Sequence, residues 1–590
     1  MASHAMNLLR YGSIVLALAV TAACSSESEP DTTGSGGSSG TNPGAGTGSG
    51  NAGKGGTAGS SGAGGAGGAI AGASAGGAAG SATAGTGASS AGETTTGGTG
   101  ATGTVGGAAG AAGLGSGGGA GDTTGNAGMG GTAAGAAGGS GSAGAPPEVD
   151  EPELVTSAQN AYWQVGTLTE TTSGNAEVTV NDGMALQTWS GFGGTFNEKG
   201  WEALSALSEA DRAAAIKLLF DKVDGANFVY GRIPIGASDY ATSRYTLNDT
   251  AGDTAMTNFS IERDLERLIP YIKAAQAVKP DIHFWGSPWT PPPWMKDNNA
   301  YDRGNMKDDN ANLQAYALYL ALFVERYGEQ GITIEGIHPQ NEPGYPQDYP
   351  SCLWTGALMA KFIGQFLGPT FEDRGVEAEI FIGTMSNPDT DGTVLTTVMN
   401  NATAKAFVKG YGLQWGMIDR YSSLNMDTSL QIWQTEHKCG NYPWVSGTDQ
   451  SRAPNDHAYG VESWGLIRDW IKKGVNAYSA WNMVLDTIGR SLDTVRPWAQ
   501  NALLAVDTSG KRLVITPTYY VFRHLSQYVD PGAQVVGTTG GDALAFKNPD
   551  GSIVAVLYNS GGAKMTTVAL GGKKYQFDMP GNGWATVNVK

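Results

Sequence analysis

Residues 336–350 read GIHPQNEPGYPQDYP, a stretch that begins like a buried strand and ends in polar and rigid residues. A strand that only filled a core would not close on Gln340, Asn341 and Glu342 followed by Pro343. Polar groups at the carboxyl end of a strand are typical of a (β/α)₈ barrel, whose active site lies at that end. The stretch therefore predicts a strand that presents a carboxylate and an amide, with Pro343 fixing the backbone just beyond them.

Short apolar runs alternate with longer amphipathic segments on both sides of this stretch. The expected strands are residues 189–196, 227–235, 281–288, 334–341, 378–384, 410–417, 430–436 and 477–484. Apolar residues at three- and four-residue intervals predict helices over 209–223, 261–278, 312–328 and 518–529. Eight strands, each followed by a helix or a helix-length segment, predict an α/β fold, a (β/α)₈ TIM barrel over residues 189–528.

The chain that flanks the barrel has a different texture, with apolar and polar residues alternating between turn residues. After the barrel, short strands are expected at 543–548, 552–559, 565–572, 575–579 and 584–590. Residues 162–170 and 176–180, before the barrel, show the same alternation. We expect segments 151–188 and 529–590 to pair into one side antiparallel β-sandwich domain, built from both ends of the folded region.

The first residues are typical of a secretory signal peptide, expected over residues 1–23. Arg10 precedes the apolar run GSIVLALAV, which leads into TAAC and is too short to be a stable membrane span. Cys24 follows small residues and resembles the lipobox cysteine of bacterial lipoproteins, although Thr21 stands where that pattern usually has Leu. We expect an exported protein, lipid-anchored through Cys24 to the bacterial envelope or cell surface; secretion after ordinary cleavage near Ala23 is the alternative.

Residues 24–150 are expected to be a disordered linker. From Ser25 to Pro147 the sequence is almost wholly Gly, Ala, Ser and Thr, which offers too little apolar side chain to offset the entropy of ordering. Glycine does not recur strictly at every third position, which excludes a collagen-like helix. The formal net charge of −18 and the lack of any Lys/Arg run argue against nucleic acid as a partner.

Two glutamates are the strongest candidates for chemistry. The charged residues at expected strand ends are Glu198, Arg232, Asp239, Glu342 and Glu436. Glutamates on separate strands can converge across a barrel mouth, and glycoside cleavage needs one protonated and one ionised carboxyl group. Tryptophans, whose faces pack against the CH faces of sugars, stand near the strand ends at 289, 294, 354, 444 and 481. A salt bridge or loop cap is the alternative for either glutamate alone, but the pair with these tryptophans favours catalysis.

Six motifs, in this order, resemble the successive strand ends of glycoside hydrolase family 30. They are WSGFGGTF (189–196), GRIPIGASDY (231–240), GSPWTPPPWMK (286–296), PQNEP (339–343), QTE (434–436) and AWNMVLD (480–486). The resemblance covers roughly residues 155–590, barrel and side domain together. The family includes glucosylceramidases, β-1,6-glucanases, β-1,6-galactanases and xylanases, so the resemblance implies a retaining β-glycosidase.

Carried over residue by residue, the resemblance implies that Glu342 is the general acid/base and Glu436 the nucleophile. Asn341 would hold the sugar 2-hydroxyl, and Asp239 would bind hydroxyls farther from the reacting carbon. Arg232 would contact Glu436 and keep it ionised, while a less solvated Glu342 stays protonated.

Aromatic positions are carried over in the same way. Trp289 and Trp481 match aromatic walls of the subsite that holds the reacting sugar, with barrel-top packing as the alternative for both. For Trp294, barrel-top packing is nearly as strong an interpretation as sugar binding. Glu198 falls near a position that varies in the family, which favours a structural role.

One segment departs from the glucosylceramidase pattern. Where that pattern has a His-Trp-Tyr-like end, this chain has Gln414, Trp415 and Gly416. The missing tyrosine implies the loss of one hydrogen bond to the nucleophile, and it favours a polysaccharide-active branch over a ceramide-active one. His437 and Lys438 follow the nucleophile and suggest a more polar pocket.

Cysteine usage suggests a disulfide. If Cys24 takes lipid, Cys352 and Cys439 remain as a pair in an oxidising compartment, each a few residues beyond a catalytic strand. We expect a disulfide between Cys352 and Cys439, with two free thiols as the alternative.

Two rival functions remain. A metal-dependent hydrolase is disfavoured because none of the six histidines shows HExxH spacing, so no metal and no cofactor are expected. A non-catalytic carbohydrate-binding surface lipoprotein would not require both glutamates together with Asn341 and Arg232. The sequence thus predicts double-displacement hydrolysis of a β-linked polysaccharide or oligosaccharide, of β-1,6-glucanase or β-1,6-galactanase type. Xylanase or glucosylceramidase activity is the alternative, and no obligate protein partner is evident.

Overall fold

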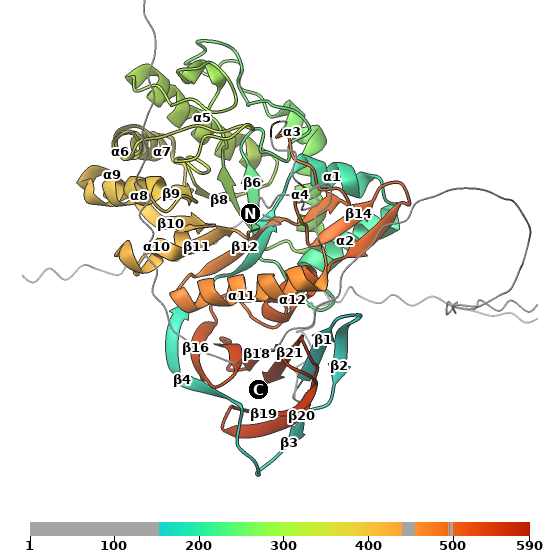
Figure 1. Ribbon diagram of the computed structural model, residues 1–590. Coiled ribbons are helices and arrows are strands. Elements are labelled where there is room, and N and C mark those ends of the chain that lie inside the picture. Colours follow the sequence, from blue (N-terminus) through green and yellow to red (C-terminus); the bar gives the residue numbers. More distant parts are fainter. Residues whose placement is uncertain (1–152, 439–454, 494, 496–498) are drawn as a thin grey trace, which may run out of the picture. The chain divides into compact units, whose positions relative to one another are not determined.

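The computed structural model of the protein describes residues 153–438, 455–493, 495 and 499–590. Eight parallel strands form a closed barrel in chain order, in which the last strand pairs with the first (Figure 1). They are β5 (Gly191–Thr195), β6 (Tyr230–Pro234), β7 (His283–Ser287), β8 (Ile334–Ile337), β9 (Glu379–Met385), β10 (Val408–Gln414), β11 (Gln431–Glu436) and β12 (Ala477–Asn482). The predicted TIM barrel is confirmed, and each expected strand overlaps one of these eight.

Helices follow the barrel strands and cover the outside of the barrel (Figure 1). They are α1 (Glu198–Ser205), α2 (Glu209–Phe220), α3 (Glu262–Arg267), α4 (Ile269–Val278), α5 (Asn310–Glu329), α6 (Gly356–Phe362), α7 (Gly368–Arg374), α8 (Thr390–Asn400), α9 (Ala402–Phe407), α10 (Met417–Arg420), α11 (His457–Lys473) and α12 (Pro517–Ser526). Side chains of Ser208, Asp309 and Thr516 cap the starts of α2, α5 and α12 by accepting a backbone N–H.

The prediction of a single helix over residues 261–278 is wrong in one respect, because the structure has two helices there, α3 and α4. Pro270 lies in the first turn of α4. A proline has no backbone N–H to donate and its ring crowds the preceding turn, so it is tolerated at a helix start and not in a helix interior.

A ten-stranded sheet forms the side domain, in the order β2-β1-β21-β18-β17-β16-β4-β19-β20-β3, and it combines strands from both ends of the described chain (Figure 1). The early strands are β1 (Glu153–Ala158), β2 (Ala161–Gly166), β3 (Thr169–Glu170) and β4 (Val178–Thr188). The late strands are β16 (Gln534–Thr539), β17 (Asp542–Lys547), β18 (Ile553–Asn559), β19 (Lys564–Leu570), β20 (Lys573–Met579) and β21 (Gly583–Val589). All pairings are antiparallel except that of β4 with β19. The predicted antiparallel side domain, built from both ends of the folded region, is therefore confirmed.

A three-stranded sheet between β12 and α12 was not expected from the sequence. Its strands are β13 (Val484–Asp486), β14 (Leu504–Asp507) and β15 (Arg512–Ile515). The loop between β13 and β14 brings Gln500 to the barrel mouth, so this small sheet contributes to the site described below.

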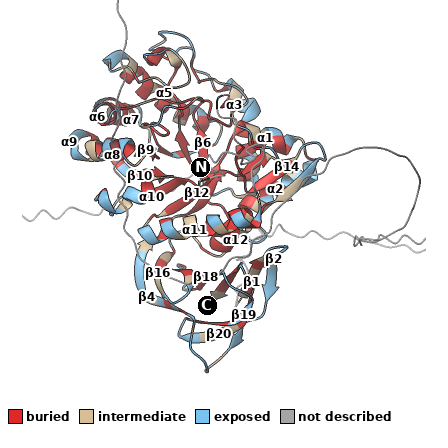
Figure 2. Cartoon of the chain, in the orientation of Figure 1, coloured by how far each residue is buried: buried red, intermediate tan, exposed pale blue. Residues whose placement is uncertain are grey.

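Burial is deepest in the barrel strands, whereas the surrounding helices are buried on one side only (Figure 2). Helix α12 joins the barrel to the side domain. Both ring nitrogens of the buried His524 lie 2.8 Å from hydroxyls of the side domain, those of Ser157 and Thr586.

Predictions for the N-terminal part, namely the signal peptide, the lipidated Cys24 and the linker, lie outside the described residues. Within the described residues, no helix is long and apolar enough to cross a membrane.

Candidate active site

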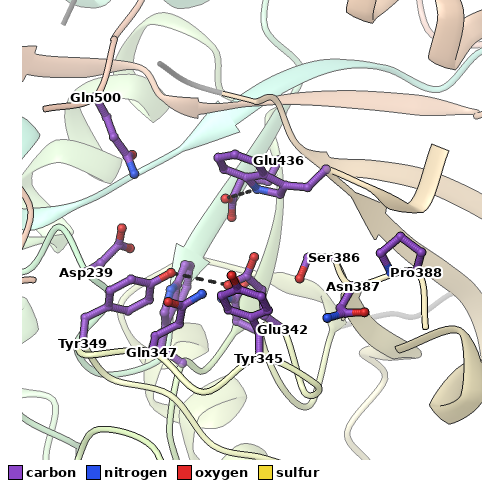
Figure 3. Close-up of a pocket in the computed structure, with 13 residues that line it drawn as sticks. Asp239, Glu342, Tyr345, Gln347, Tyr349, Ser386, Asn387, Pro388, Glu436 and Gln500 are labelled. Carbon is purple, nitrogen blue, oxygen red and sulfur yellow. Dashed lines mark hydrogen bonds between the residues drawn. The ribbon is translucent and has the colours of Figure 1, made fainter. Parts of the chain in front are cut away.

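A pocket of about 230 Å³ opens at the carboxyl ends of the barrel strands (Figure 3). Of the residues predicted from the sequence, Asp239, Trp289, Asn341, Glu342 and Glu436 line it. The remaining lining residues are Tyr345, Gln347, Tyr349, Ser386, Asn387, Pro388, Trp415 and Gln500. In Figure 3 the two glutamates border the same cavity, with Asp239 and Gln500 on one side and Ser386, Asn387 and Pro388 on the other.

The turn after β8 aims Glu342 into this pocket. The backbone N–H of Asn341 donates to the Pro288 carbonyl at 2.8 Å, and that of Glu342 donates to the Thr384 carbonyl at 2.9 Å. These bonds tie the turn to the ends of both neighbouring strands. Glu342 has a left-handed φ of 48°, a conformation that costs a non-glycine residue about 1–3 kcal/mol. The strain accompanies a side chain that is turned toward the cavity.

Glu436, the last residue of β11, has a hydrogen-bond donor on each carboxylate oxygen. The guanidinium Nη1 of Arg232 lies 2.8 Å from Oε2, and the indole Nε1 of Trp415 donates to Oε1 at 2.8 Å. Arg232 is fully buried on β6, so its charge is not screened by water. This pairing fixes both the orientation and the charge of the Glu436 carboxylate.

Glu342 has a different environment. The hydrogen-bond partners of its carboxyl group are neutral: the hydroxyl of Tyr349 and the amide Nε2 of Gln414, each at 3.4 Å, and the side chain of Ser386. Burial, and then the charge of Glu436, raise the pKa of Glu342 to about 8. Burial raises the pKa of Glu436 as well, but Arg232 and the donor from Trp415 oppose that rise. Glu436 therefore loses its proton first, and the two carboxyl groups divide into one acid and one carboxylate.

Gln414 joins the two carboxyl groups. Its side-chain amide contacts Glu342 and, by hydrogen bonding, lowers the pKa of Glu436. The Thr435 hydroxyl donates to the Gln414 side-chain oxygen at 2.9 Å, which directs the NH₂ end toward the glutamates. Because the same amide lies within reach of both carboxyl groups, those of Glu342 and Glu436 are close together.

Gly416 stands where the glucosylceramidase pattern has tyrosine, and glycine has no side chain that could donate a hydrogen bond. The indole Nε1 of the preceding residue, Trp415, donates to Glu436 Oε1 at 2.8 Å. Trp415 has a left-handed φ of 50°, which is unusual for a bulky side chain. The backbone at the end of β10 turns the tryptophan toward Glu436, and the loss of a tyrosine donor at position 416 stays a prediction.

Two predicted polar residues offer groups to a ligand. Asn341 Oδ1 accepts from Arg232 at 2.6 Å and from Thr384 at 2.8 Å, which leaves its Nδ2 donor without an acceptor among the described residues. Asp239 is buried, and its Oδ1 has no hydrogen-bond partner in the described part of the chain. An unpaired buried oxygen is costly, so its position beside a pocket indicates a group that a ligand satisfies.

The predicted tryptophans occupy different positions. Trp289 lines the pocket, and Trp481 stacks on it with ring centroids 5.2 Å apart, without lining the pocket itself. The Arg232 guanidinium lies over both rings, 4.4 Å and 5.4 Å from their centroids. Trp294 lies outside the pocket and donates to the Asn248 carbonyl at 3.1 Å.

Other predicted residues lie elsewhere. Glu198 forms a 2.8 Å ion pair with Arg263 outside the pocket; burial alone would raise its pKa, but hydrogen bonds from Arg263 and Thr242 lower it.

Cys352 is buried and forms no disulfide within the described part of the chain, and Cys439 lies outside it, so the disulfide stays a prediction. The described residues contain no group of three or more His, Cys, Asp or Glu arranged to hold a metal.

Several lining residues were missed in the sequence. Ser386 and Asn387 follow β9 directly, and the rule that barrel sites gather at strand ends could have found them. Gln500 comes from the loop between β13 and β14, and Tyr349 comes from the loop between β8 and α6, so no local pattern marked either.

Comparisons with known proteins agree with this geometry. The sequence model described as the glycosyl hydrolase family 30 TIM-barrel domain matches residues 189–529, and that of the family's β-sandwich domain matches residues 532–587. The chain is 28% identical over 416 residues to putative glucosylceramidase 1 of Caenorhabditis elegans, covering 66% of this chain and 77% of that one. It is 25% identical over 468 residues to endo-1,6-beta-D-glucanase neg1 of Aspergillus fumigatus, covering 72% and 87%. The solved endo-beta1,6-glucanase BT3312 superposes with a TM-score of 0.65 at 25% identity, covering 74% of this chain and 99% of that one.

Proposed function

The chain belongs to glycosyl hydrolase family 30 and is a glycoside hydrolase, and we propose that it cleaves β-linked polysaccharide with retention of anomeric configuration. One observation carries the proposal. Arg232 forms a 2.8 Å ion pair with Glu436, while Glu342, on the same pocket, has neutral partners and a pKa raised by burial to about 8. These environments suit a nucleophilic carboxylate and a protonated acid.

The proposed reaction has two displacements. First, the Glu436 carboxylate attacks the anomeric carbon while Glu342 gives its proton to the departing glycosidic oxygen, so an ester bond forms as the glycosidic bond breaks. Glu342, now ionised, then takes a proton from a water molecule whose oxygen attacks the same carbon and releases Glu436. Retention requires the carboxyl groups to lie about 5–5.5 Å apart, and an amide shared by both supports such a short separation.

Recognition of the sugar is assigned to the other polar groups of the pocket. The Asn341 amide would donate to the 2-hydroxyl, and Asp239 would accept from hydroxyls farther from the reacting carbon. Trp289, backed by Trp481, would pack against the sugar ring. Arg232 acts through Glu436 and is a positioning residue.

We propose a β-1,6-linked glucan as the substrate, with β-1,6-galactan as the next choice and xylan behind them. The names of the Aspergillus relative and of the solved glucanase support the glucan. Glucosylceramide is a second candidate, favoured by the name of the Caenorhabditis relative.

Export and anchoring through Cys24 also remain proposals. A Cys24→Ser variant expressed in a bacterial host should move from the membrane fraction to the soluble fraction. Equal membrane association of the variant and the parent would contradict the lipid anchor.

Purified protein should be tested against β-1,6-glucan, β-1,6-galactan, xylan and glucosylceramide, with NMR detection of the first anomer released. We expect turnover on a β-1,6-linked polymer and a β-anomer first. A Glu436→Gln variant should lose turnover by roughly 10⁴-fold or more while it still binds the polymer. Inversion, or binding without any turnover by the parent, would contradict the proposal.

A further inference from the structure

A second cleft, which we call the side cleft, lies between the β1–β2 strand pair and the end of α12. Its volume is about 690 Å³, against about 230 Å³ for the candidate active site, and the two share no lining residue. The side cleft is defined here by Trp163, Val165, Val223, Arg523, Tyr528 and Asn588, among other residues that line it. It is therefore a separate surface feature.

Trp163 lines this cleft, and its backbone conformation is strained. Its φ is 55°, in the left-handed region, at a cost of about 1–3 kcal/mol for a non-glycine residue. Neighbouring strand residues normally point to opposite faces. Here Tyr162 stacks on Tyr520 of α12 at 4.9 Å, and Trp163 lies over the guanidinium of Arg523, also of α12, at 3.9 Å. The strain turns both aromatic side chains to the same side of the strand.

The cleft leaves apolar surface in contact with water. The Trp163 and Tyr528 rings are within 10° of parallel, with centroids 6.4 Å apart. Val165 is 84% exposed and Val223 is 65% exposed, and both line the cleft. Aromatic and aliphatic surfaces gathered in one cleft favour a ligand that has apolar faces.

Polar groups of both signs complete the walls. Lys222 and Asp530 form a 2.8 Å ion pair at the rim, and Asp550 also lines the cleft. Mixed charge disfavours a polyanion or a polycation. Asn588 Oδ1 has no hydrogen-bond partner among the described residues, so this wall offers an acceptor for a donated hydroxyl.

We propose that the side cleft binds a neutral β-linked glycan chain, as a second carbohydrate site apart from the candidate active site. Sugars present apolar CH faces and hydroxyl groups together, which matches this combination of parallel aromatic rings, exposed valines and mixed polar groups. The choice of a β-linked glycan rests on the proposed function. A polymer held at two sites has a raised effective concentration at the catalytic one, whereas a small glycoside gains nothing.

The test uses the whole folded protein. Val165→Glu places a charge in the cleft at an exposed position, where it should not affect folding. Met565→Glu is the matched control, because Met565 is a half-exposed residue of β19 in the same sheet and does not line the cleft. Trp163→Ala removes the aromatic ring. Each change is made in the parent and in the Glu436→Gln background, and retention on insoluble β-1,6-glucan is measured beside kcat/KM on a p-nitrophenyl β-glycoside.

We expect Val165→Glu and Trp163→Ala to lower retention and polymer hydrolysis at least fivefold, with kcat/KM on the small glycoside unchanged. Met565→Glu should change none of these. Two results would overturn the side-cleft proposal. One is equal retention of the Val165→Glu and Met565→Glu variants on the insoluble glucan, and the other is no retention of the Glu436→Gln variant that carries no further substitution. The proposed function fails by a different result, which is the absence of hydrolysis of any β-linked glycan by the unaltered protein.

Discussion

At the residue scale, the difference between Glu342 and Glu436 comes from their partners. Both are buried glutamates on one pocket, and either could be the acid in isolation. Of the two glutamates, Glu436 is the one that accepts hydrogen bonds from the Arg232 guanidinium and the Trp415 indole. The difference between the two carboxyl groups therefore depends on Arg232 of β6 and on Trp415, which follows β10.

The pH dependence of activity should report the Glu342 proton. Its pKa is raised to about 8, mainly by burial, so the acid form predominates below that pH and is lost above it. We expect kcat/KM to fall about tenfold per pH unit above pH 8. Glu342→Gln should abolish this basic limb when the rate is measured on an aryl glycoside whose leaving group needs no proton. A basic limb that persists in the variant would assign it to another group.

Trp415→Phe should weaken the orientation and charge stabilisation of Glu436, the proposed nucleophile. A hydrogen bond to a charged group contributes about 1.5–3 kcal/mol, so kcat should fall roughly 10- to 100-fold. Without this donor the pKa of Glu436 rises, and the acidic limb of kcat/KM should move to higher pH. Trp294→Phe is the control, since its indole donates to a backbone carbonyl outside the pocket. An acidic limb that moves equally in both variants would mean that Trp415 has no specific role.

At the element scale, the barrel depends on glycines that allow bulky side chains inside it. A Cβ on Gly412 of β10 would lie 2.2 Å from the Gly383 carbonyl oxygen and 2.6 Å from His338 Nδ1. His338 in turn packs against Trp285 and Phe381, with ring centroids 4.5 Å away in each case. Strand β10 was identified from its sequence, but the requirement for glycine depends on neighbouring strands.

Gly412→Ala should therefore destabilise the protein by about 1–3 kcal/mol, the usual cost of overpacking a core. Gly328→Ala is the control, because Gly328 is exposed on helix α5 and a Cβ there meets nothing within 4 Å. That change should be neutral or stabilise by up to about 1 kcal/mol. Urea unfolding measures both, and equal stability of Gly412→Ala and the parent would contradict the packing argument.

At the scale of the whole molecule, the side domain is attached to the barrel partly through a titratable group. His524 of α12 lies between the hydroxyls of Ser157 and Thr586. Burial, with a smaller effect of the Arg523 charge, lowers the pKa of His524 to about 3. The histidine is therefore neutral when folded and takes up a proton on unfolding below about pH 6.5.

Acidification should weaken this attachment. Because the unfolded state binds the extra proton, the contribution of His524 to stability is present above pH 6.5 and is lost as the pH falls from 6.5 toward 3. At pH 5 the loss is about 2 kcal/mol. His524→Gln does not titrate, so the unaltered protein should lose about 2 kcal/mol more than the variant between pH 7 and pH 5 in urea unfolding. Parallel pH dependences would contradict this assignment.

The sequence by itself determined the barrel, the side domain and the two glutamates. Hydrophobic periodicity marks the eight barrel strands and the longer helices locally. Glu342 follows one barrel strand and Glu436 ends another, so the topology of a barrel brings them to one rim. The break at Pro270 was also readable locally, since its cause lies in one residue.

Only the tertiary structure decided which donors reach each carboxylate. Trp415 reaches Glu436 because of a left-handed turn, and the Gln414 amide lies within reach of both glutamates. Gln500 reaches the pocket on the loop between β13 and β14, far along the chain. The side cleft likewise needs Trp163 and Arg523 together. These contacts join residues distant in the chain, and their energies depend on distances and burial that no local pattern encodes.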